Sequence, residues 1–233
     1  MTRPVQMPLD LGGGPSYGEA DFLVADGNRE AFAAIEGWTA WRAPTLALAG
    51  PEGSGKTHLA QIFAARSGGR AISATALRAD QVAGLADGPT VAVDDADRGV
   101  DEAALFHLVN LTRERGRRLL LTGREPPARW AVALPDLRSR LTALPVVAIG
   151  QPDEGLLAAL LVKLFADRQV RVDPELPAYL LPRLERSFAA VRAAVAALDQ
   201  AALAGRRAVT PALARETLGL GLGGGATRDR SDG

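Results

Sequence analysis

The stretch that most constrains the fold of this chain is GPEGSGKT, residues 50–57. It fits the pattern G-x-x-x-x-G-K-[ST], with the apolar run TLALAG leading into it and a helix-like apolar segment, KTHLAQIFAARSG, leading out. In a strand-loop-helix context, the glycines let the loop curl so that backbone N–H groups and the helix N-terminus point at phosphate oxygens. The pattern therefore predicts a nucleotide phosphate site rather than an ordinary glycine-rich turn.

Individual side chains of this loop have expected roles. Lys56 would pair with the terminal phosphates, and Thr57 would ligate Mg²⁺ through its hydroxyl. The backbone at Gly53, Ser54 and Gly55 would curl around the phosphate oxygens. We expect ADP or ATP with Mg²⁺ as the bound cofactor.

Apolar runs alternate with helical segments through the first part of the chain. The five expected strands are residues 45–50, 70–73, 90–95, 117–123 and 144–150. Short apolar runs separated by helices, such as the helix expected at residues 102–114, are typical of a buried parallel sheet with crossover connections. The expected fold class is α/β.

Past residue 150 the pattern changes to helices only. Apolar stripes at helical spacing comprise Leu157, Leu160, Leu161 and Leu164, then Phe188, Val191, Val195, Leu198 and Ala202. Thr210 followed by Pro211 predicts the capped start of a last short helix. We expect four parts: an N-terminal peptide and linker (1–20), an α/β nucleotide-binding subdomain (21–150), an all-helical subdomain (151–218) and a disordered tail (219–233).

Acidic and hydroxyl side chains end two of the expected strands. In TVAVDDAD, Asp94 can hold the Mg²⁺ shell and Asp95 can orient or deprotonate a water, although two such aspartates alone would suit a capped loop start. Asp97 has no such role, and we expect it to cap a helix. Thr122 ends the run RRLLLTG near the same sheet edge, where it can position a water or sense the γ-phosphate.

Charge and composition limit the partners. Lys+Arg and Asp+Glu are equal at 27 each, so no net positive field would drive non-specific binding to DNA or anionic membranes. The absence of cysteine excludes disulfides and thiolate sites. No stretch approaches the roughly 18 to 20 apolar residues of a membrane span, and no targeting segment is evident. We therefore expect a soluble, cytoplasmic protein.

Arginines in two segments have a mechanistic alternative to plain solvation. The segment LPDLRSRL carries Arg138 and Arg140, and arginines on such a short helix are usually solvated. In a nucleotide-hydrolysing assembly, however, an arginine can reach the γ-phosphate held by a neighbouring subunit. Arg192, in the later helical segment, could likewise turn inward toward the phosphates.

Together these motifs, over residues 22–218, resemble those of the AAA+ ATPases and, within them, of the DnaA branch. The resemblance implies an AAA+ P-loop core with a parallel sheet, followed by an all-helical lid. It puts Arg140 at the arginine-finger position, Arg192 at sensor 2 and Thr122 in sensor 1. The ending GKTHL adds His58 to the nucleotide site, and FLVADGNREAF resembles the branch's adenine-packing motif, which implies contacts from Leu23 and Asn28.

DnaA carries a further C-terminal DNA-reading domain, whereas this sequence runs into a glycine-rich tail. It resembles the Hda-like regulators of the branch, which lack that domain, dock on the sliding clamp (the beta subunit of DNA polymerase III) and stimulate hydrolysis of DnaA-bound ATP. The resemblance implies a negative regulator of replication initiation with the clamp and DnaA as partners. We expect the protein to contact DNA only through the clamp and to bind no membrane. The motifs do not decide between a monomer and a homodimer.

The peptide QMPLDL has the Q-x-x-L-x-L spacing of bacterial clamp-binding peptides, carried here by Gln6, Leu9 and Leu11. An extended peptide can seat an amide in one pocket and alternating apolar side chains in another. The following glycines would give it reach. The alternative is a tail whose leucines pack back on the core.

Two departures from the family pattern bear on activity. Arg124 stands where the sensor 1 region often has an acidic residue, and Asp95 replaces the glutamate of fast AAA+ motors. We therefore expect weak intrinsic ATPase activity at most. Rival interpretations are a helicase-loader or clamp-loader type ATPase, a P-loop small-molecule kinase, and a scaffold with a dead nucleotide site.

Overall fold

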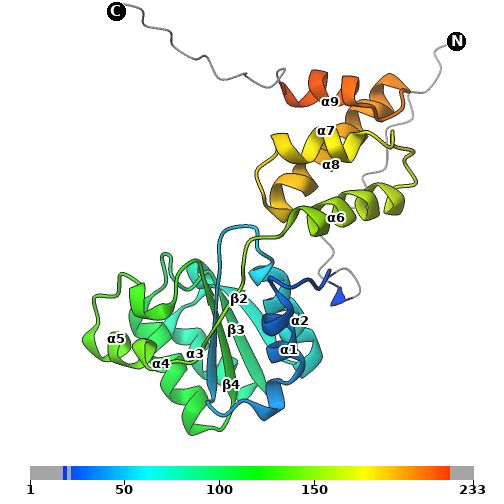
Figure 1. Ribbon diagram of the computed structural model, residues 1–233. Coiled ribbons are helices and arrows are strands. Elements are labelled where there is room, and N and C mark those ends of the chain that lie inside the picture. Colours follow the sequence, from blue (N-terminus) through cyan, green and yellow to red (C-terminus); the bar gives the residue numbers. More distant parts are fainter. Residues whose placement is uncertain (1–17, 20–21, 221–233) are drawn as a thin grey trace, which may run out of the picture.

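Five parallel strands form one sheet in the order β2-β3-β4-β1-β5 (Figure 1). They are β1 (Thr45–Ala49), β2 (Arg70–Ser73), β3 (Thr90–Asp94), β4 (Arg118–Gly123) and β5 (Val146–Ala148). The computed structural model describes residues 18–19 and 22–220. All strand pairings within these residues are parallel, which confirms the predicted α/β class.

Helices cover both faces of the sheet. They are α1 (Arg29–Glu36), α2 (Lys56–Ser67), α3 (Val82–Asp87), α4 (Glu102–Glu114) and α5 (Pro135–Thr142). The α1 and α2 helices share one apolar core with the sheet, and α3, α4 and α5 share another on the opposite face. Figure 1 shows the two groups on either side of the strands.

The central strand β4 is buried on both sides. Leu119 and Leu121 face the core under α3 and α4, while Leu120 faces the core under α1 and α2, and none of the three is exposed. The edge strands differ from the expectation of a buried run: β2 is half exposed, and Val146 of β5 is 41% exposed. An edge strand has a neighbour on one side only, so part of it meets solvent.

The second part is built from helices, α6 (Glu154–Asp167), α7 (Leu176–Leu180), α8 (Phe188–Gly205) and α9 (Pro211–Leu218), with one isolated parallel bridge between Val172 and Val209 in the described chain. Both predicted leucine-rich stripes lie in its core, with Phe188 at the margin. The Thr210 hydroxyl accepts a hydrogen bond from the Leu213 backbone, which confirms the predicted cap. Asp153 and Ser187 cap α6 and α8 in the same way.

Helix α8 is long and apolar enough to cross a membrane by length and composition alone, contrary to our sequence expectation. Its 18-residue window has a mean hydropathy of 1.3. The buried stripe of α8, however, packs against α6 and α9 in the helical core. That packing is typical of the core helix of a globular domain.

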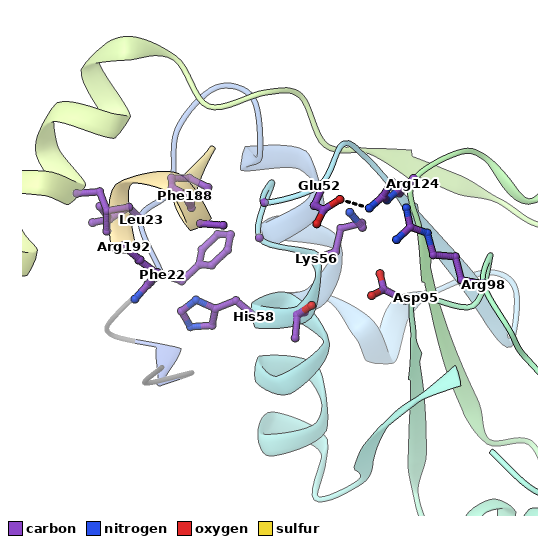
Figure 2. Close-up of a pocket in the computed structure, with 15 residues that line it drawn as sticks. Phe22, Leu23, Glu52, Lys56, His58, Asp95, Arg98, Arg124, Phe188 and Arg192 are labelled. Carbon is purple, nitrogen blue, oxygen red and sulfur yellow. Dashed lines mark hydrogen bonds and ion pairs between the residues drawn. The ribbon is translucent and has the colours of Figure 1, made fainter. Parts of the chain in front are cut away.

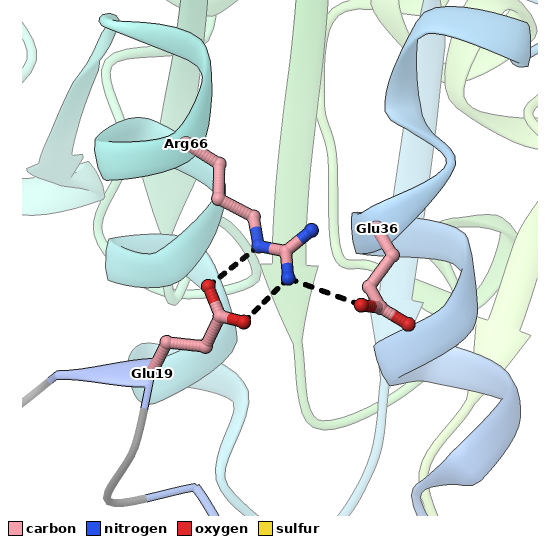
Figure 3. A network of polar contacts seen from close by, with 3 residues as sticks. All are labelled: Glu19, Glu36 and Arg66. Atoms are coloured by element: carbon pink, nitrogen blue, oxygen red, sulfur yellow. Dashed lines mark hydrogen bonds and ion pairs between the residues drawn. The ribbon is translucent and has the colours of Figure 1, made fainter.

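An ion-pair network links Glu19, which precedes the sheet in the chain, and Glu36 of α1 to Arg66 of α2 (Figure 3). The Arg66 guanidinium donates to both carboxylate oxygens of Glu19, the Nε bond being 2.6 Å, and to Glu36 at 3.0 Å. These contacts lower the pKa of Glu19 and raise the pKa of Arg66. The network is solvent-exposed, so we assign it a positioning role rather than a large share of stability.

Candidate functional site

The loop between β1 and α2 has the curled geometry that its sequence predicts. Gly53 and Gly55 have φ angles of +70° and +97°, in the left-handed region that favours glycine. Gly55 also stands directly before the first residue of α2, Lys56. The phosphate loop therefore ends at a helix N-terminus, where backbone N–H groups can bind an anion.

This loop forms the floor of a cavity of about 310 Å³ between the sheet edge and the helical part (Figure 2). Its lining comprises Phe22, Leu23, Glu52, Gly53, Gly55, Lys56, Thr57, His58, Asp95, Arg98, Arg124, Leu160, Phe188, Ala189 and Arg192. Figure 2 shows the apolar and aromatic side chains on one side of the loop and most charged ones on the other. The apolar end of the cavity thus suits the base of a nucleotide, and the charged end suits its phosphates.

Lys56 is buried, with 6% of its surface exposed, and its Nζ donates to the carbonyls of Gly50 and Pro51 at 2.7 and 2.8 Å. Burial lowers the pKa of Lys56, and the nearby Asp95 and Asp94 oppose that shift. Phosphate oxygens are stronger acceptors than these carbonyls for a charged donor. Lys56 therefore lines the cavity with a cation that a phosphate group can engage.

A chain of short hydrogen bonds joins the predicted metal and catalytic residues. The Thr57 hydroxyl donates to Asp94 Oδ2 at 2.8 Å, and the Thr122 hydroxyl donates to Asp94 Oδ1 at 2.6 Å. Thr122 in turn accepts from the backbone N–H of Asp95 at 2.9 Å. The structure thus brings Thr57, Asp94, Asp95 and Thr122 together at the carboxyl ends of β3 and β4.

Asp95 has an unusual backbone and an altered acidity. Its φ of +54° is left-handed, which aspartate tolerates better than most residues. Burial and the neighbouring Asp94 raise the pKa of Asp95, while Lys56 opposes the rise. A carboxylate with a raised pKa, facing the cavity, can exchange a proton with a bound water.

The oxygen ligands at this end of the cavity suit Mg²⁺ only in company with a nucleotide. No group of three or more His, Cys, Asp or Glu that could hold a metal occurs among residues 18–19 and 22–220. Thr57 and Asp94 offer two adjacent oxygen ligands, and Mg²⁺ usually binds through one or two protein oxygens plus phosphates and waters. The residues present therefore fit a nucleotide-borne Mg²⁺ and not an all-protein metal site.

The base end of the cavity is built by aromatic residues that sequence reasoning largely missed. Phe22 stacks on Phe32 with centroids 5.4 Å apart and meets the His58 ring edge-on at 5.2 Å. Phe188 closes the same end from the first turn of α8. Leu23 and His58, both expected here, lie in the wall. The apolar position of Phe188 in a helical stripe gave no sign that it faces a cavity.

The side chains of two residues expected at the nucleotide, Asn28 and Ser54, do not line the cavity. Asn28 is 3% exposed; its amide donates to the Leu23 carbonyl at 2.9 Å and accepts from the Ala25 N–H at 2.8 Å. Ser54 is 1% exposed, and its hydroxyl has no partner among the described residues. Asn28 therefore shapes the turn that carries Leu23, and Ser54 contributes its backbone rather than its side chain to the loop.

The arginines separate into three environments. Arg192 lines the cavity beside Leu23 (Figure 2). Arg138 donates from Nε to the Val132 carbonyl at 3.0 Å and is thereby held against its own subdomain. Arg140 does not line the cavity; its guanidinium lies 5.5 Å from the centroid of Phe106 and has no carboxylate in ion-pair range in the described chain.

The expectation that Asp97 caps a helix is wrong. The cap of α4 is Asp101, which accepts from the Ala104 N–H at 3.0 Å. Asp97 Oδ2 instead accepts from the backbone N–H of Arg124 at 2.9 Å. The spacing could have identified the cap, because Asp101 directly precedes the helix expected at residues 102–114, whereas Asp97 lies four residues further back.

Of the predicted tail (219–233), Gly219 follows α9 and Leu220 packs against the helical core. Residues 221–233 and the predicted clamp-contact residues Gln6, Leu9 and Leu11 lie outside the described residues. Nothing in the structure bears on them.

No protein-family model matches the chain. Among solved structures it is similar to domain III of the Thermotoga maritima replication initiation protein DnaA, with TM-score 0.75, 19% identity, and coverage of 88% of this chain and 97% of that one. AMPPCP-bound DnaA from Aquifex aeolicus gives TM-score 0.66 and 21% identity, covering 82% and 67%. The Thermotoga maritima RuvB Holliday junction branch migration motor gives TM-score 0.68 and 16% identity, covering 88% and 72%. These likenesses show that the chain shares the fold of DnaA domain III, as the sequence motifs predict.

Proposed function

We propose that this chain is a cytoplasmic, nucleotide-binding AAA+ regulator that restrains DNA replication initiation. It would hold ADP or ATP with Mg²⁺ in its own cavity. It would act on a second molecule, DnaA, whose bound ATP is hydrolysed faster when Arg140 reaches it. The sliding clamp would bind the N-terminal peptide and bring the two together.

The nucleotide part of the proposal is supported by the cavity. A curled glycine loop, a buried lysine and adjacent Thr57 and Asp94 oxygens meet at one end, and aromatic side chains meet at the other. Two of the similar DnaA structures hold the ATP analogue AMPPCP. Asp95 has a shorter reach than a glutamate, which favours slow intrinsic turnover and a main role as an activator.

The placement of Arg140 is the observation that carries the proposed action on a partner. It lies in the last turn of α5, outside its own cavity, and stacks on Phe106 without a carboxylate partner in the described chain. A guanidinium stacked on an aromatic ring is oriented yet keeps its N–H donors available. Such a group can stabilise the charge of a γ-phosphate held by another subunit.

The test is the hydrolysis of radiolabelled ATP on DnaA, with clamp-loaded DNA and the full chain. Arg140→Ala should abolish most of the stimulation, on the order of 10³-fold if the arginine acts on the transition state. Arg129→Ala is the matched control, because Arg129 is an exposed arginine nearby whose one ion-pair partner among the described residues is Glu125 at 3.0 Å. Equal stimulation by wild type and Arg140→Ala would refute the proposed action.

Four further measurements separate the rival functions. Replacing Gln6 and Leu9 by alanine should abolish pull-down by purified clamp while leaving nucleotide binding intact. Lys56→Ala should remove nucleotide binding and the regulation with it, whereas a scaffold with a dead site would keep regulation. Rapid DNA-stimulated hydrolysis by the chain alone would favour a loader ATPase, and phosphate transfer to a small acceptor would favour a kinase.

A further inference from the structure

The loop after β4 places an arginine, Arg124, at the charged end of the cavity. Arg124 lines the cavity, and its guanidinium forms an ion pair with Glu52 of the phosphate loop (Figure 2). The two residues come from different connections, β1 to α2 and β4 to α5. Their pairing therefore bridges the rim of the cavity.

The backbone under Arg124 is fixed on both sides. Asp97 Oδ2 accepts from the Arg124 N–H at 2.9 Å, and the Trp130 indole donates to the Glu125 carbonyl at 2.7 Å. Trp130 packs so closely on Gly123 that an added Cβ would lie 2.7 Å from its ring. Since the loop is held in this way, only the side chain of Arg124 is free to change partner.

Both side chains of this ion pair are exposed to solvent. The side chains of Arg124 and Glu52 are 37% and 72% exposed, so water screens their attraction. An arginine binds phosphate oxygens through paired, charge-assisted hydrogen bonds, which are stronger than a screened carboxylate contact. A phosphate that reaches the rim can therefore displace Glu52.

The other cavity cations are less suited to this exchange. Lys56 is buried at the base of the loop, and Arg192 lies beside Leu23 on the opposite side in Figure 2. Arg98 lies at the same end as Arg124 but has no ion-pair partner in the described chain. Arg124 alone combines a place at the rim with a competing carboxylate on the phosphate loop.

We propose that Arg124 and Glu52 form a switchable ion pair that sets the preference for ATP over ADP. Glu52 holds the guanidinium when the bound nucleotide ends at the β-phosphate, and the γ-phosphate of ATP takes the place of Glu52. Arg124 then reads the γ-phosphate within its own subunit. The inference rests on the proposed nucleotide binding and adds the regulation of that same site.

The test compares dissociation constants for AMPPCP and ADP, measured with Mg²⁺ by titration calorimetry on the full chain. Arg124→Gln should weaken AMPPCP binding about 10- to 100-fold and leave ADP binding nearly unchanged, because one charge-assisted contact is lost. Glu52→Gln should tighten AMPPCP binding alone, because the competitor is removed. Arg129→Gln, on the same connection but outside the cavity, should change neither constant.

The charge swap Glu52→Arg with Arg124→Glu separates this mechanism from a structural salt bridge. The swap keeps the ion pair, so a merely structural pair would be rescued and both nucleotides would bind as in wild type. The switch predicts instead that AMPPCP binding stays weak, because a glutamate now meets the γ-phosphate. Rescue, an equal loss for both nucleotides in Arg124→Gln, or loss of preference only in Arg98→Gln would each overturn it.

The two proposals fail differently. If wild type binds neither nucleotide, the proposed function fails and the switch with it. If ADP binds normally and the preference for AMPPCP is unchanged in Arg124→Gln and Glu52→Gln, only the switch fails. If the Arg124 variant folds poorly, Glu52→Gln still tests the switch. Glu52 is exposed, and its replacement should tighten AMPPCP binding where the Arg124 variant should weaken it.

Discussion

Gly53 of the phosphate loop lies directly against Ser187 at the start of α8: a Cβ added to Gly53 would come within 2.7 Å of the Ser187 Cβ. The Gly53 carbonyl also accepts a hydrogen bond from the Phe188 N–H at 3.2 Å. The helical part therefore rests on the loop that would hold the phosphates. A change in that loop is transmitted to the helical part by contact.

Gly53→Ala should loosen this contact and weaken nucleotide binding. The φ of +70° adds strain of about 1–2 kcal/mol for any non-glycine residue, and the clash with Ser187 adds to it. Gly68→Ala is the matched control, because Gly68 has a φ of +66° and nothing within 4 Å of its added Cβ. Thermal unfolding should show a larger loss of Tm for Gly53→Ala; equal losses would mean that the contact has no energetic role.

The sequence predicted what depends on local pattern. Glycines at left-handed positions, the lysine and threonine after them, and aspartates after an apolar strand have fixed chain spacing, so the loop and the β3 end were predictable. The contact between Gly53 and Ser187 joins residues far apart in the chain, and no pattern encodes it. The bond from the Arg124 N–H to Asp97 shows the same limit, whereas Asp101 directly precedes the predicted helix and could have been identified as its cap.

The arginines show why the partners of a side chain cannot be predicted from the sequence alone. Arg138 and Arg140 lie two residues apart on one short helix, and both fitted an outward-reaching role. In the structure, Arg138 is bound to the Val132 carbonyl and Arg140 is not. Neighbouring helix positions point in different directions, but which direction meets a carbonyl depends on the loop folded beneath it.

Glu102→Ala should impair the proposed action of Arg140 without touching the cavity. Glu102 accepts from the N–H groups of Ala133 and Leu134 at 2.9 and 2.7 Å and so fixes the start of α5, which carries Arg140. The variant should reduce stimulated hydrolysis on DnaA while its own affinity for ADP stays at the wild-type value. Glu114→Ala, at the other end of α4, is the control and should retain full stimulation.

The same glutamate predicts a pH dependence. Hydrogen bonds from Ala133 and Leu134 lower the pKa of Glu102 below its ordinary value of 4.5. Its stabilising contribution is therefore present above about pH 4.5 and lost as the pH falls through the lower folded-state value. The Tm difference between wild type and Glu102→Ala should be largest near neutral pH and should vanish in acid; a constant difference would contradict the electrostatic origin.

Asp95→Asn should stabilise the protein at neutral pH. The pKa of Asp95 is raised above 3.8, so its ionised form opposes folding above the folded-state value and not below pH 3.8. The gain in Tm should therefore shrink as the pH falls toward about 4. Asp101→Asn is the control, because asparagine caps a helix about as well as aspartate. A gain that persists in acid would assign the effect to the left-handed backbone instead.

Thr122→Val should be costly although the two side chains have nearly the same shape. Thr122 is fully buried, and its hydroxyl links Asp94 Oδ1 at 2.6 Å to the Asp95 N–H at 2.9 Å. Valine leaves both groups with one partner fewer, at a cost of about 1–3 kcal/mol. For a chain of this size we expect Tm to fall by a few degrees for each kcal/mol, together with weaker Mg²⁺-dependent nucleotide binding, because Asp94 loses its fixed position.

Thr112→Val provides the comparison for this substitution. Thr112 is equally buried, but its hydroxyl donates to the Leu108 carbonyl at 2.8 Å within its own helix and does not line the cavity. Its loss removes one bond from a carbonyl that the helix backbone also engages, so the Tm change should be small. If both valine variants unfold at the same temperature and bind nucleotide equally, the hydroxyl of Thr122 does not organise the two aspartates.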